Sequence, residues 1–194
     1  MTRAFLAIPL PGEVRDRLHD LIAGLRADLP AVRWSRPETL HLTLRFFGDL
    51  DEESLEKIGK IMLSIGRLHA PFAVDLIGLG SFPAANRARV FWLGVRDRGE
   101  LAALHDAFER QLPDAGIPRE QRPFFPHLTL GRHRGSGLAA GPLLARHGEW
   151  DCGRLPVTRL VLYESRLRPG GALHLPRHSV PLGAAAPRSG TVNQ

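Results

Sequence analysis

The amino-acid sequence predicts an α+β protein made of two related lobes. Strand-like stretches, in which apolar and polar residues alternate, are mixed along the chain with amphipathic helical stretches. The sequence His-Leu-Thr-Leu also occurs twice, at residues 41–44 and 127–130, once in each half of the chain. Because each copy falls in a similar succession of predicted strands and helices, we interpret the chain as an internal repeat.

The first half of the chain is predicted to contain two helices among its strands. One helix begins at Pro11 and Gly12 and ends at Pro30, with its apolar residues on one face. The other follows a turn predicted at Gly48 and Asp49, and its acidic first turn suits the positive end of a helix dipole. Extended segments are expected at residues 3–9, 32–35, 39–47, 72–79 and 88–95.

The second half of the chain repeats this order of elements. The expected elements are a helix at 98–112, a strand at 124–131, a short helix near 138–147, and strands near 155–164 and 172–181. Residues 1–183 are therefore expected to form a single two-lobed domain. The aperiodic residues 184–194 are predicted to be a flexible tail.

Composition argues against some classes of protein and favours others. No run of about 18 uninterrupted apolar residues is present, so no membrane span is expected. A single cysteine, Cys152, rules out an internal disulfide and favours a reducing, cytoplasmic location. The net charge of +6 is carried almost entirely by arginine, which favours a polyanionic partner. Nothing in the sequence demands a second subunit, so a monomer is expected.

The two His-Leu-Thr-Leu segments carry the candidate chemistry. Side chains at positions i and i+2 of a strand point to the same face, so His41 shares a face with Thr43, and His127 with Thr129. If the two strands face each other across a cleft, two imidazoles and two hydroxyls converge. Imidazoles exchange protons near neutral pH, and threonine hydroxyls donate hydrogen bonds to phosphate oxygens. No carboxylate lies within either motif, which argues against a metal site or a Ser-His-Asp triad.

Two arginines are predicted to complete the site. By strand alternation Arg45 continues the face of His41 and Thr43, and Arg132 follows Gly131, where glycine permits the strand to kink. A guanidinium group beside a phosphate neutralises charge that develops in the transition state. The other histidines are interpreted as structural residues of helices and loops, namely His19, His69, His105, His133, His147, His174 and His178.

The repeated motif resembles the paired histidine–threonine motifs of the two-histidine phosphoesterase superfamily. More closely, the chain is similar to the bacterial and archaeal RNA 2′,3′-cyclic phosphodiesterases once named 2′-5′ RNA ligases. The similarity extends over residues 3–182, through the segments FLAIPLP, VRWSRPETLHLTLRFFGDLDEE, GLGSFPAANRARVFWLGV, RPFFPHLTLGRHR and YESRLRPGGALHLPRHSVPL. Ordered similarity of this length is far more specific than the short motifs alone.

This resemblance implies a fold, an activity and a set of residue roles. The fold would consist of two pseudo-symmetric lobes whose antiparallel sheets line a central cleft, with helices on the outside. The activity would be hydrolysis of RNA 2′,3′-cyclic phosphate ends to 2′-phosphates, without a metal or another cofactor. His41 would be the proton donor and His127 the proton acceptor, and the phosphate would be held by Thr43, Thr129 and Arg132. The aromatic residues expected to stack on a base are Phe47, Phe82, Phe125 and Tyr163.

Three other interpretations are compatible with the same residues. A reversible 2′-5′ RNA ligase would use the same groups, because water and a 5′-hydroxyl open the cyclic phosphate in the same way. A phosphodiesterase acting on a small cyclic nucleotide or on ADP-ribose cyclic phosphate would also use them. The last alternative is a non-catalytic module that binds RNA ends in a basic cleft. Binding without product formation would support that module.

Overall fold

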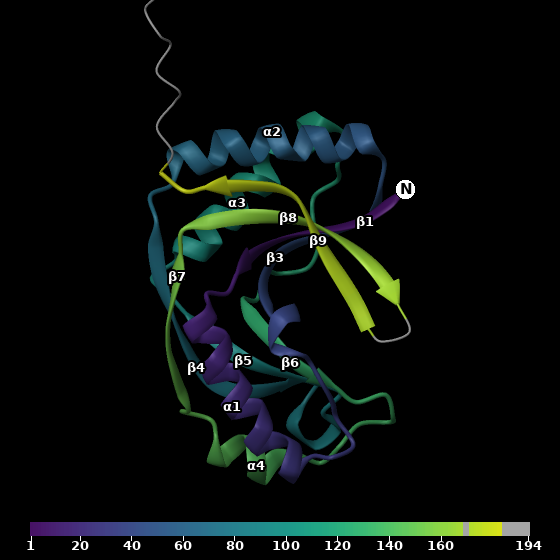
Figure 1. The fold of residues 1–194 in the computed structure, drawn as a ribbon, viewed down its shortest axis with the longest axis vertical. Helices are drawn as coiled ribbons and strands as arrows, with labels where there is room; N and C mark the ends of the chain where they lie inside the picture. Colours follow the sequence, from purple (N-terminus) through teal and green to yellow (C-terminus); the bar gives the residue numbers. More distant parts are fainter. Residues whose placement is uncertain (169–170, 184–194) are drawn as a thin grey trace, which may run out of the picture.

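The computed structural model describes residues 1–168 and 171–183, which form nine β-strands and four α-helices (Figure 1). The strands are β1 (Thr2–Pro9), β2 (Arg33–Trp34), β3 (His41–Leu50), β4 (Phe72–Phe82), β5 (Val90–Arg96), β6 (His127–Arg132), β7 (Asp151–Val157), β8 (Arg159–Arg168) and β9 (Gly171–Pro181). The helices are α1 (Gly12–Asp28), α2 (Glu52–Leu68), α3 (Glu100–Gln111) and α4 (Gly141–Arg146). The predicted tail at 184–194 lies outside the described residues.

The strands form two antiparallel sheets. The four-stranded sheet has the order β3-β1-β8-β9, and the five-stranded sheet has the order β2-β6-β5-β4-β7. Helices α2 and α3 pack against the four-stranded sheet, and α1 and α4 pack against the five-stranded sheet (Figure 1). The motif strands β3 and β6 belong to different sheets, yet some of their Cα atoms lie within 8 Å of each other. The predicted α+β fold with two antiparallel sheets is confirmed.

The chain passes twice through the succession strand, helix, motif strand, helix, strand. The first passage is β1, α1, β3, α2 and β4, with the two-residue strand β2 inserted between α1 and β3, and the second is β5, α3, β6, α4 and β7. Helix α1 of the first passage contacts β7, which is in the same sheet as β6, the motif strand of the second passage. Helix α3 of the second passage contacts β3, the motif strand of the first passage. This exchange of helices ties the two lobes together.

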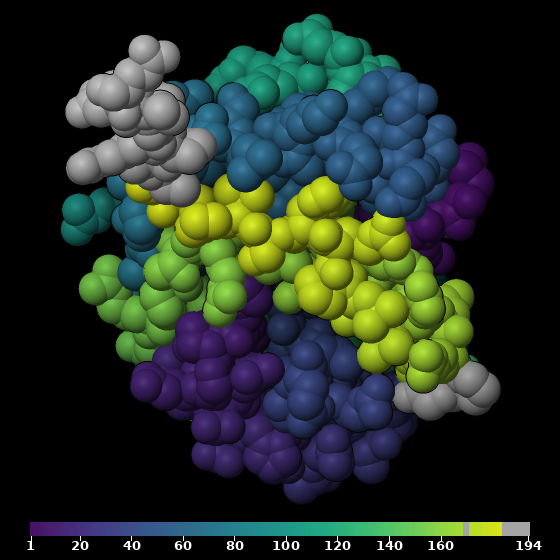
Figure 2. Space-filling model, turned by 45° about the horizontal axis from the view of Figure 1, so that its top comes forward, coloured from purple at the N-terminus to yellow at the C-terminus, as the bar shows by residue number. Residues whose placement is uncertain are grey.

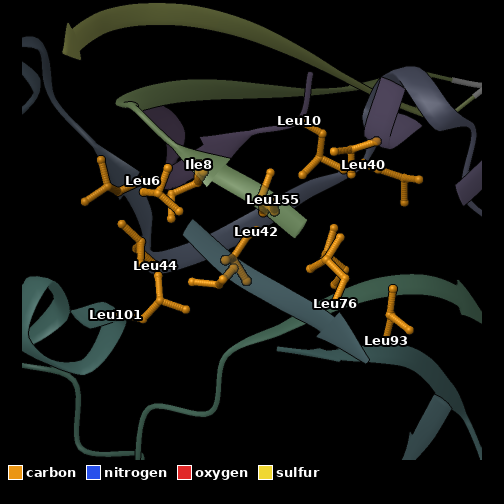
Figure 3. Close-up of a cluster of buried hydrophobic side chains, with 14 of the residues drawn as sticks. Leu6, Ile8, Leu10, Leu40, Leu42, Leu44, Leu76, Leu93, Leu101 and Leu155 are labelled. Carbon is orange, nitrogen blue, oxygen red and sulfur yellow. The ribbon is translucent and has the colours of Figure 1, made fainter. Parts of the chain in front are cut away.

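The two sheets share one hydrophobic core. Figure 3 shows leucines of β1 and β3 packed together with leucines of β4, β5 and β7. Leu42 and Leu44 of the first motif are buried, and so are Leu128 and Leu130 of the second. Burying a leucine side chain contributes roughly 1.5–3 kcal/mol. Each motif is therefore anchored through the strand face opposite its histidine.

Helix α2 has an identifiable start and an identifiable reason for its close packing. The carboxylate of Asp51 caps the helix by accepting a hydrogen bond from the backbone N–H of Ser54 at 2.8 Å. Two buried glycines, Gly59 and Gly66, let the helix approach β9, as the blue helix and the yellow strand show in Figure 2. A Cβ atom at Gly66 would lie 2.6 Å from Cγ1 of Val180, so a larger residue would force the helix away from the strand.

The strand ends differ from the sequence prediction at two places. The turn predicted at Gly48 and Asp49 is wrong, because β3 continues through both residues and stays paired with β1. Gly48 has a φ of 77°, and the pairing skips Phe47 beside it; a glycine with positive φ serves a β-bulge as well as a turn. The strand predicted near 155–164 is the junction of β7 and β8, which lie in different sheets and are separated only by Thr158.

Candidate active site

A cleft of about 1640 Å³ opens between the two sheets. His41 and Thr43 of β3 line it together with His127 and Thr129 of β6. Each pair lies on the strand face opposite its buried leucines, as the alternation of a strand requires. The structure therefore brings the two imidazoles and the two hydroxyls to the same cleft.

Both motif histidines are held in the same way. Nδ1 of His41 lies 2.8 Å from the carbonyl oxygen of Thr39, and Nδ1 of His127 lies 2.7 Å from the carbonyl oxygen of Phe125. In each case the partner is the residue two positions before the histidine. Because a carbonyl oxygen only accepts hydrogen bonds, each Nδ1 carries a proton and donates it. Nε2 is then the nitrogen available to exchange a proton with a bound molecule.

The ring of His41 is enclosed by other rings. It stacks on Phe5 with 4.6 Å between ring centroids, and it meets His174 edge to face at 5.2 Å. Burial lowers the pKa of His41 to about 4, against the carbonyl of Thr39, which raises it, and His174 adds a smaller lowering contribution. Burial also lowers the pKa of His174. The imidazoles of His41 and His174 are therefore neutral at pH 7.

A second aromatic cluster surrounds His127. Phe82 meets its ring edge to face at 5.2 Å between centroids, and the ring of Phe125 lies 5.9 Å away. Phe82 lines the cleft, and Phe125 is 51% exposed beside it. The other two aromatic residues expected near a base, Phe47 and Tyr163, are not among the residues that line the cleft.

Each motif strand contains a β-bulge directly after its threonine. The pairing of β3 with β1 skips Leu44, and the pairing of β6 with β5 skips Leu130. One extra residue shifts the alternation of strand faces by one position. The fifth residue after each histidine therefore returns to the cleft, and both of these residues, Phe46 and Arg132, line it.

The prediction that Arg45 shares the cleft face with His41 is wrong. The bulge turns its side chain to the buried face, where the residue is 9% exposed. Nε lies 2.7 Å from the carboxylate of Glu109, and Nη1 lies 3.2 Å from that of Glu120. Nη2 donates a hydrogen bond to the carbonyl oxygen of Pro118 at 2.9 Å. Arg45 therefore fastens β3 to α3 and to the segment that leads into β6.

Seven other arginines line the cleft, and among the described residues that line it none is acidic. These arginines are Arg33, Arg36, Arg89, Arg122, Arg132, Arg134 and Arg168. No carboxylate of the described chain forms an ion pair with any of them. The cleft is therefore strongly cationic and suited to phosphate groups.

The structure adds cleft residues that the sequence reasoning did not single out. Strand alternation alone places Phe46 on the buried face, because the sequence does not show the bulge at Leu44 that turns its side chain to the cleft. His133 and His174 were both interpreted as structural, yet both line the cleft. His174 lies on β9 and not on a helix or loop. The strand predicted at 172–181 already indicated this position.

Other sites for chemistry are scarce in the parts of the chain that the structure describes. Within residues 1–168 and 171–183, no three histidine, cysteine, aspartate or glutamate side chains are grouped so that they could hold a metal ion. In the same ranges, none of the helices has both the length and the apolar character that a membrane crossing needs. Burial raises the pKa of the Cys152 thiol to about 11, so it stays protonated at neutral pH.

Comparison of the amino-acid sequence with known families assigns the chain to one of them. The sequence matches the 2′-5′ RNA ligase superfamily over residues 6–168. The chain belongs to this superfamily. Among its relatives, the RNA 2′,3′-cyclic phosphodiesterase of Methanothermobacter thermautotrophicus is 32% identical over 89% of this chain and 94% of its own length. The protein of the same name from Thermus thermophilus is 34% identical over 89% of this chain and 86% of its own length.

Solved structures agree with the architecture. A crystal structure of a Thermus thermophilus protein superposes with a TM-score of 0.80 at 29% identity, covering 95% of this chain and all of the other. The crystal structure of E. coli LigT complexed with 3′-AMP superposes with a TM-score of 0.71 at 28% identity. That match covers 94% of this chain and 99% of LigT.

Proposed function

We propose that this protein hydrolyses the 2′,3′-cyclic phosphate at the end of an RNA chain to a 2′-phosphate, without a metal, through His41 and His127. The observation that carries the proposal is the matched pair of imidazoles, each fixed through Nδ1 to a backbone carbonyl and both lining one cationic cleft. The names of the relatives support it, since those proteins are named RNA 2′,3′-cyclic phosphodiesterases.

The proposed reaction is an in-line attack of water on phosphorus. Nε2 of His127 takes a proton from the water as the new bond between its oxygen and phosphorus forms. The bond between phosphorus and the 3′ oxygen breaks, and Nε2 of His41 gives that oxygen a proton. The products are a 2′-phosphate and a 3′-hydroxyl. Each proton transfer contributes roughly 10²–10⁴-fold to the rate.

The remaining cleft residues hold the phosphate during this step. The hydroxyls of Thr43 and Thr129 donate hydrogen bonds to its non-bridging oxygens, since each threonine shares a strand face with one histidine. The guanidinium group of Arg132 neutralises the charge that develops on those oxygens. The exposed ring of Phe46 offers an apolar surface to the sugar or base.

The low pKa of His41 places a condition on its role as proton donor. This imidazole is neutral at pH 7 in the free protein, so it must take up a proton when the anionic substrate binds beside it. We expect calorimetric titration of the His127→Ala variant with cyclic-ended RNA, in buffers of different ionisation enthalpy, to show proton uptake near pH 7. If no proton is taken up, the two histidines exchange roles and His41 becomes the base.

The proposed function is tested by product analysis in the presence of EDTA. The purified protein is incubated with a short RNA that ends in a 2′,3′-cyclic phosphate, and we expect a 2′-phosphate end to form. A 3′-phosphate would reverse the assignment of the leaving oxygen. RNA that is bound but unchanged would overturn hydrolysis and support the binding module. Adding a second RNA with a 5′-hydroxyl end to the same mixture tests for ligation.

A further inference from the structure

The arginines of the cleft exceed the need of a single cyclic phosphate. A cyclic phosphodiester carries one negative charge, whereas seven guanidinium groups line the cleft. Acidic partners that would neutralise them are absent from the described lining. The surplus positive charge indicates an anion that extends beyond the two histidines.

Several of these arginines gather at one end of the five-stranded sheet. Arg33 of β2 lies directly opposite Arg132 of β6 in the antiparallel register, and on its other side Arg132 pairs with Val90 of β5. Arg89 is next to Val90, and its carbonyl oxygen accepts a hydrogen bond from the backbone N–H of His133 at 2.8 Å. Three neighbouring strands thus bring arginine residues to the same sheet end.

The tip of the other sheet meets this end of the cleft. In Figure 1 the hairpin of β8 and β9 extends on the same side of the molecule as the loop after β6. A Cβ atom at Gly171, the first residue of β9, would lie 3.5 Å from Nη2 of Arg33 and 3.9 Å from Nη2 of Arg36. These two guanidinium groups therefore lie close together, and Arg168 of the hairpin lines the same cleft.

This arrangement has an electrostatic cost in the free protein. Like charges placed directly opposite each other in a sheet are destabilising, and the pair of Arg33 and Arg132 has no carboxylate partner in the described chain. A bound polyanion removes the cost because phosphate oxygens accept bidentate hydrogen bonds from guanidinium groups. The sheet end is therefore arranged to receive phosphates.

The sheet end is also too far from the histidines to serve only the reacting phosphate. Along β6, Arg132 is the fifth residue after His127, and because the bulge takes up one of these positions the two Cα atoms are roughly 13 Å apart. Arg132 can reach back toward the reaction centre with its long side chain. Arg33 lies on β2 and Arg89 directly precedes β5, the two strands that flank β6, and both residues line the cleft beyond Arg132.

We propose that Arg33, Arg36 and Arg89 bind the backbone phosphates that precede the cyclic end, so that the substrate is an RNA chain of at least three nucleotides and not a cyclic mononucleotide. This inference rests on the proposed function. It also fixes a direction, since the strand leaves the histidines along β6 toward the end of the five-stranded sheet.

The experiment compares substrates of increasing length at two salt concentrations. Cytidine 2′,3′-cyclic phosphate and 5′-hydroxyl RNAs of two, three and five nucleotides, all with the same cyclic end, are turned over below saturation. We expect kcat/KM to rise with length up to three or more nucleotides. If three phosphates are bound, kcat/KM of the pentanucleotide should fall roughly twentyfold between 50 and 200 mM salt, against roughly threefold for the mononucleotide.

A matched pair of double variants assigns the effect to the sheet end. In Arg33→Gln/Arg89→Gln the ratio of kcat/KM for the pentanucleotide to that for the mononucleotide should fall by roughly tenfold or more. The control, Arg26→Gln/Arg98→Gln, removes the same charge from two exposed arginines outside the cleft and should keep the wild-type ratio. Urea unfolding provides a second measurement. Removing the repulsion between the arginines of the sheet end should make the urea concentration at the unfolding midpoint higher for Arg33→Gln/Arg89→Gln than for wild type.

The outcomes separate this inference from the proposed function. Equal kcat/KM and equal salt dependence for all lengths would overturn the phosphate path while leaving the hydrolase intact. If neither RNA nor mononucleotide is turned over, the proposed function fails. Fluorescence anisotropy of a labelled pentanucleotide then still decides the inference, since only the Arg33→Gln/Arg89→Gln variant should bind it more weakly. Equal binding by both double variants would overturn it.

Discussion

Strands β3 and β6 share the His-Leu-Thr-Leu sequence, the carbonyl anchor of the histidine and the bulge, and they differ in the two residues that follow. In β3, Arg45 is buried in an ion-pair network and Phe46 faces the cleft. In β6, Gly131 is buried against Trp34 and Arg132 faces the cleft. The comparison teaches that the motif sets the same histidine geometry in both lobes, whereas the two residues after the bulge give each lobe a different surface.

Replacing the histidines themselves should have the largest effect on activity. His41→Ala and His127→Ala are each expected to lower kcat by roughly 10²–10⁴-fold, because each removes one proton transfer. The pH profile of the residual activity assigns the roles, since the variant without the acid loses the decline at high pH and the variant without the base loses the decline at low pH. His19→Ala on the exposed face of α1 is the control. Full turnover in either cleft variant would refute the mechanism.

Replacing the buried residue that follows each bulge, Arg45 in β3 or Gly131 in β6, should lower the free energy of unfolding. Arg45→Met leaves Glu109 and Glu120 without their cation and is expected to cost about 3–5 kcal/mol in the free energy of unfolding. Gly131→Ala places a Cβ atom 2.8 Å from Trp34 and should cost about 1–3 kcal/mol through overpacking. Urea unfolding measures both. The double variant Arg45→Met/Glu109→Gln should be more stable than Arg45→Met, and if it is not, the ion pair is not the cause.

The buried ring of His41 should make the stability of the protein depend on pH. Burial lowers its pKa from 6.5 to about 4, so between these values the unfolded chain binds a proton that the folded chain does not. This contribution to stability is present above pH 6.5 and is lost as the pH falls toward 4. Wild type should therefore lose about 2–3 kcal/mol more than His41→Asn between pH 7 and pH 4.5 in urea unfolding. Equal losses would contradict the prediction.

The residues that face the cleft after each bulge should give smaller effects on activity. Arg132→Gln removes a charge-assisted contact to phosphate and is expected to lower kcat/KM by roughly 10- to 100-fold. Phe46→Ala removes an apolar surface for the sugar or base, and we expect KM to rise by roughly tenfold with little change in kcat. If Phe46→Ala lowered kcat as strongly as Arg132→Gln lowers kcat/KM, Phe46 would act on the reaction itself and not only as an apolar binding surface.

The sequence predicted the helices, the repeat and the pairing of the motifs because these depend on local periodicity. Alternation in a strand is a local property, and it placed His41, Thr43, His127 and Thr129 correctly on one cleft. Alternation gave the wrong face for Arg45, because a β-bulge depends on how the neighbouring strand pairs and no residue of the motif indicates it.

Long-range packing explains the other errors. At Thr158 the chain passes directly from one sheet to the other, so no turn in the sequence separates β7 from β8. The contact of His174 with His41 joins residues that are far apart in the chain, so periodicity alone does not reveal it. The gathering of Arg33, Arg89 and Arg132 likewise depends on the strand order β2-β6-β5.

The shared core beneath the cleft limits how the two lobes can move. Leu42 and Leu44 of one sheet pack among leucines of the other, so pulling the lobes apart would expose apolar surface at about 25 cal/mol per Å². Enzymes that close around a substrate by a hinge need an interface that opens at little cost. This core offers no such interface. The cleft is thus preformed, and a molecule that binds in it must fit a fixed width.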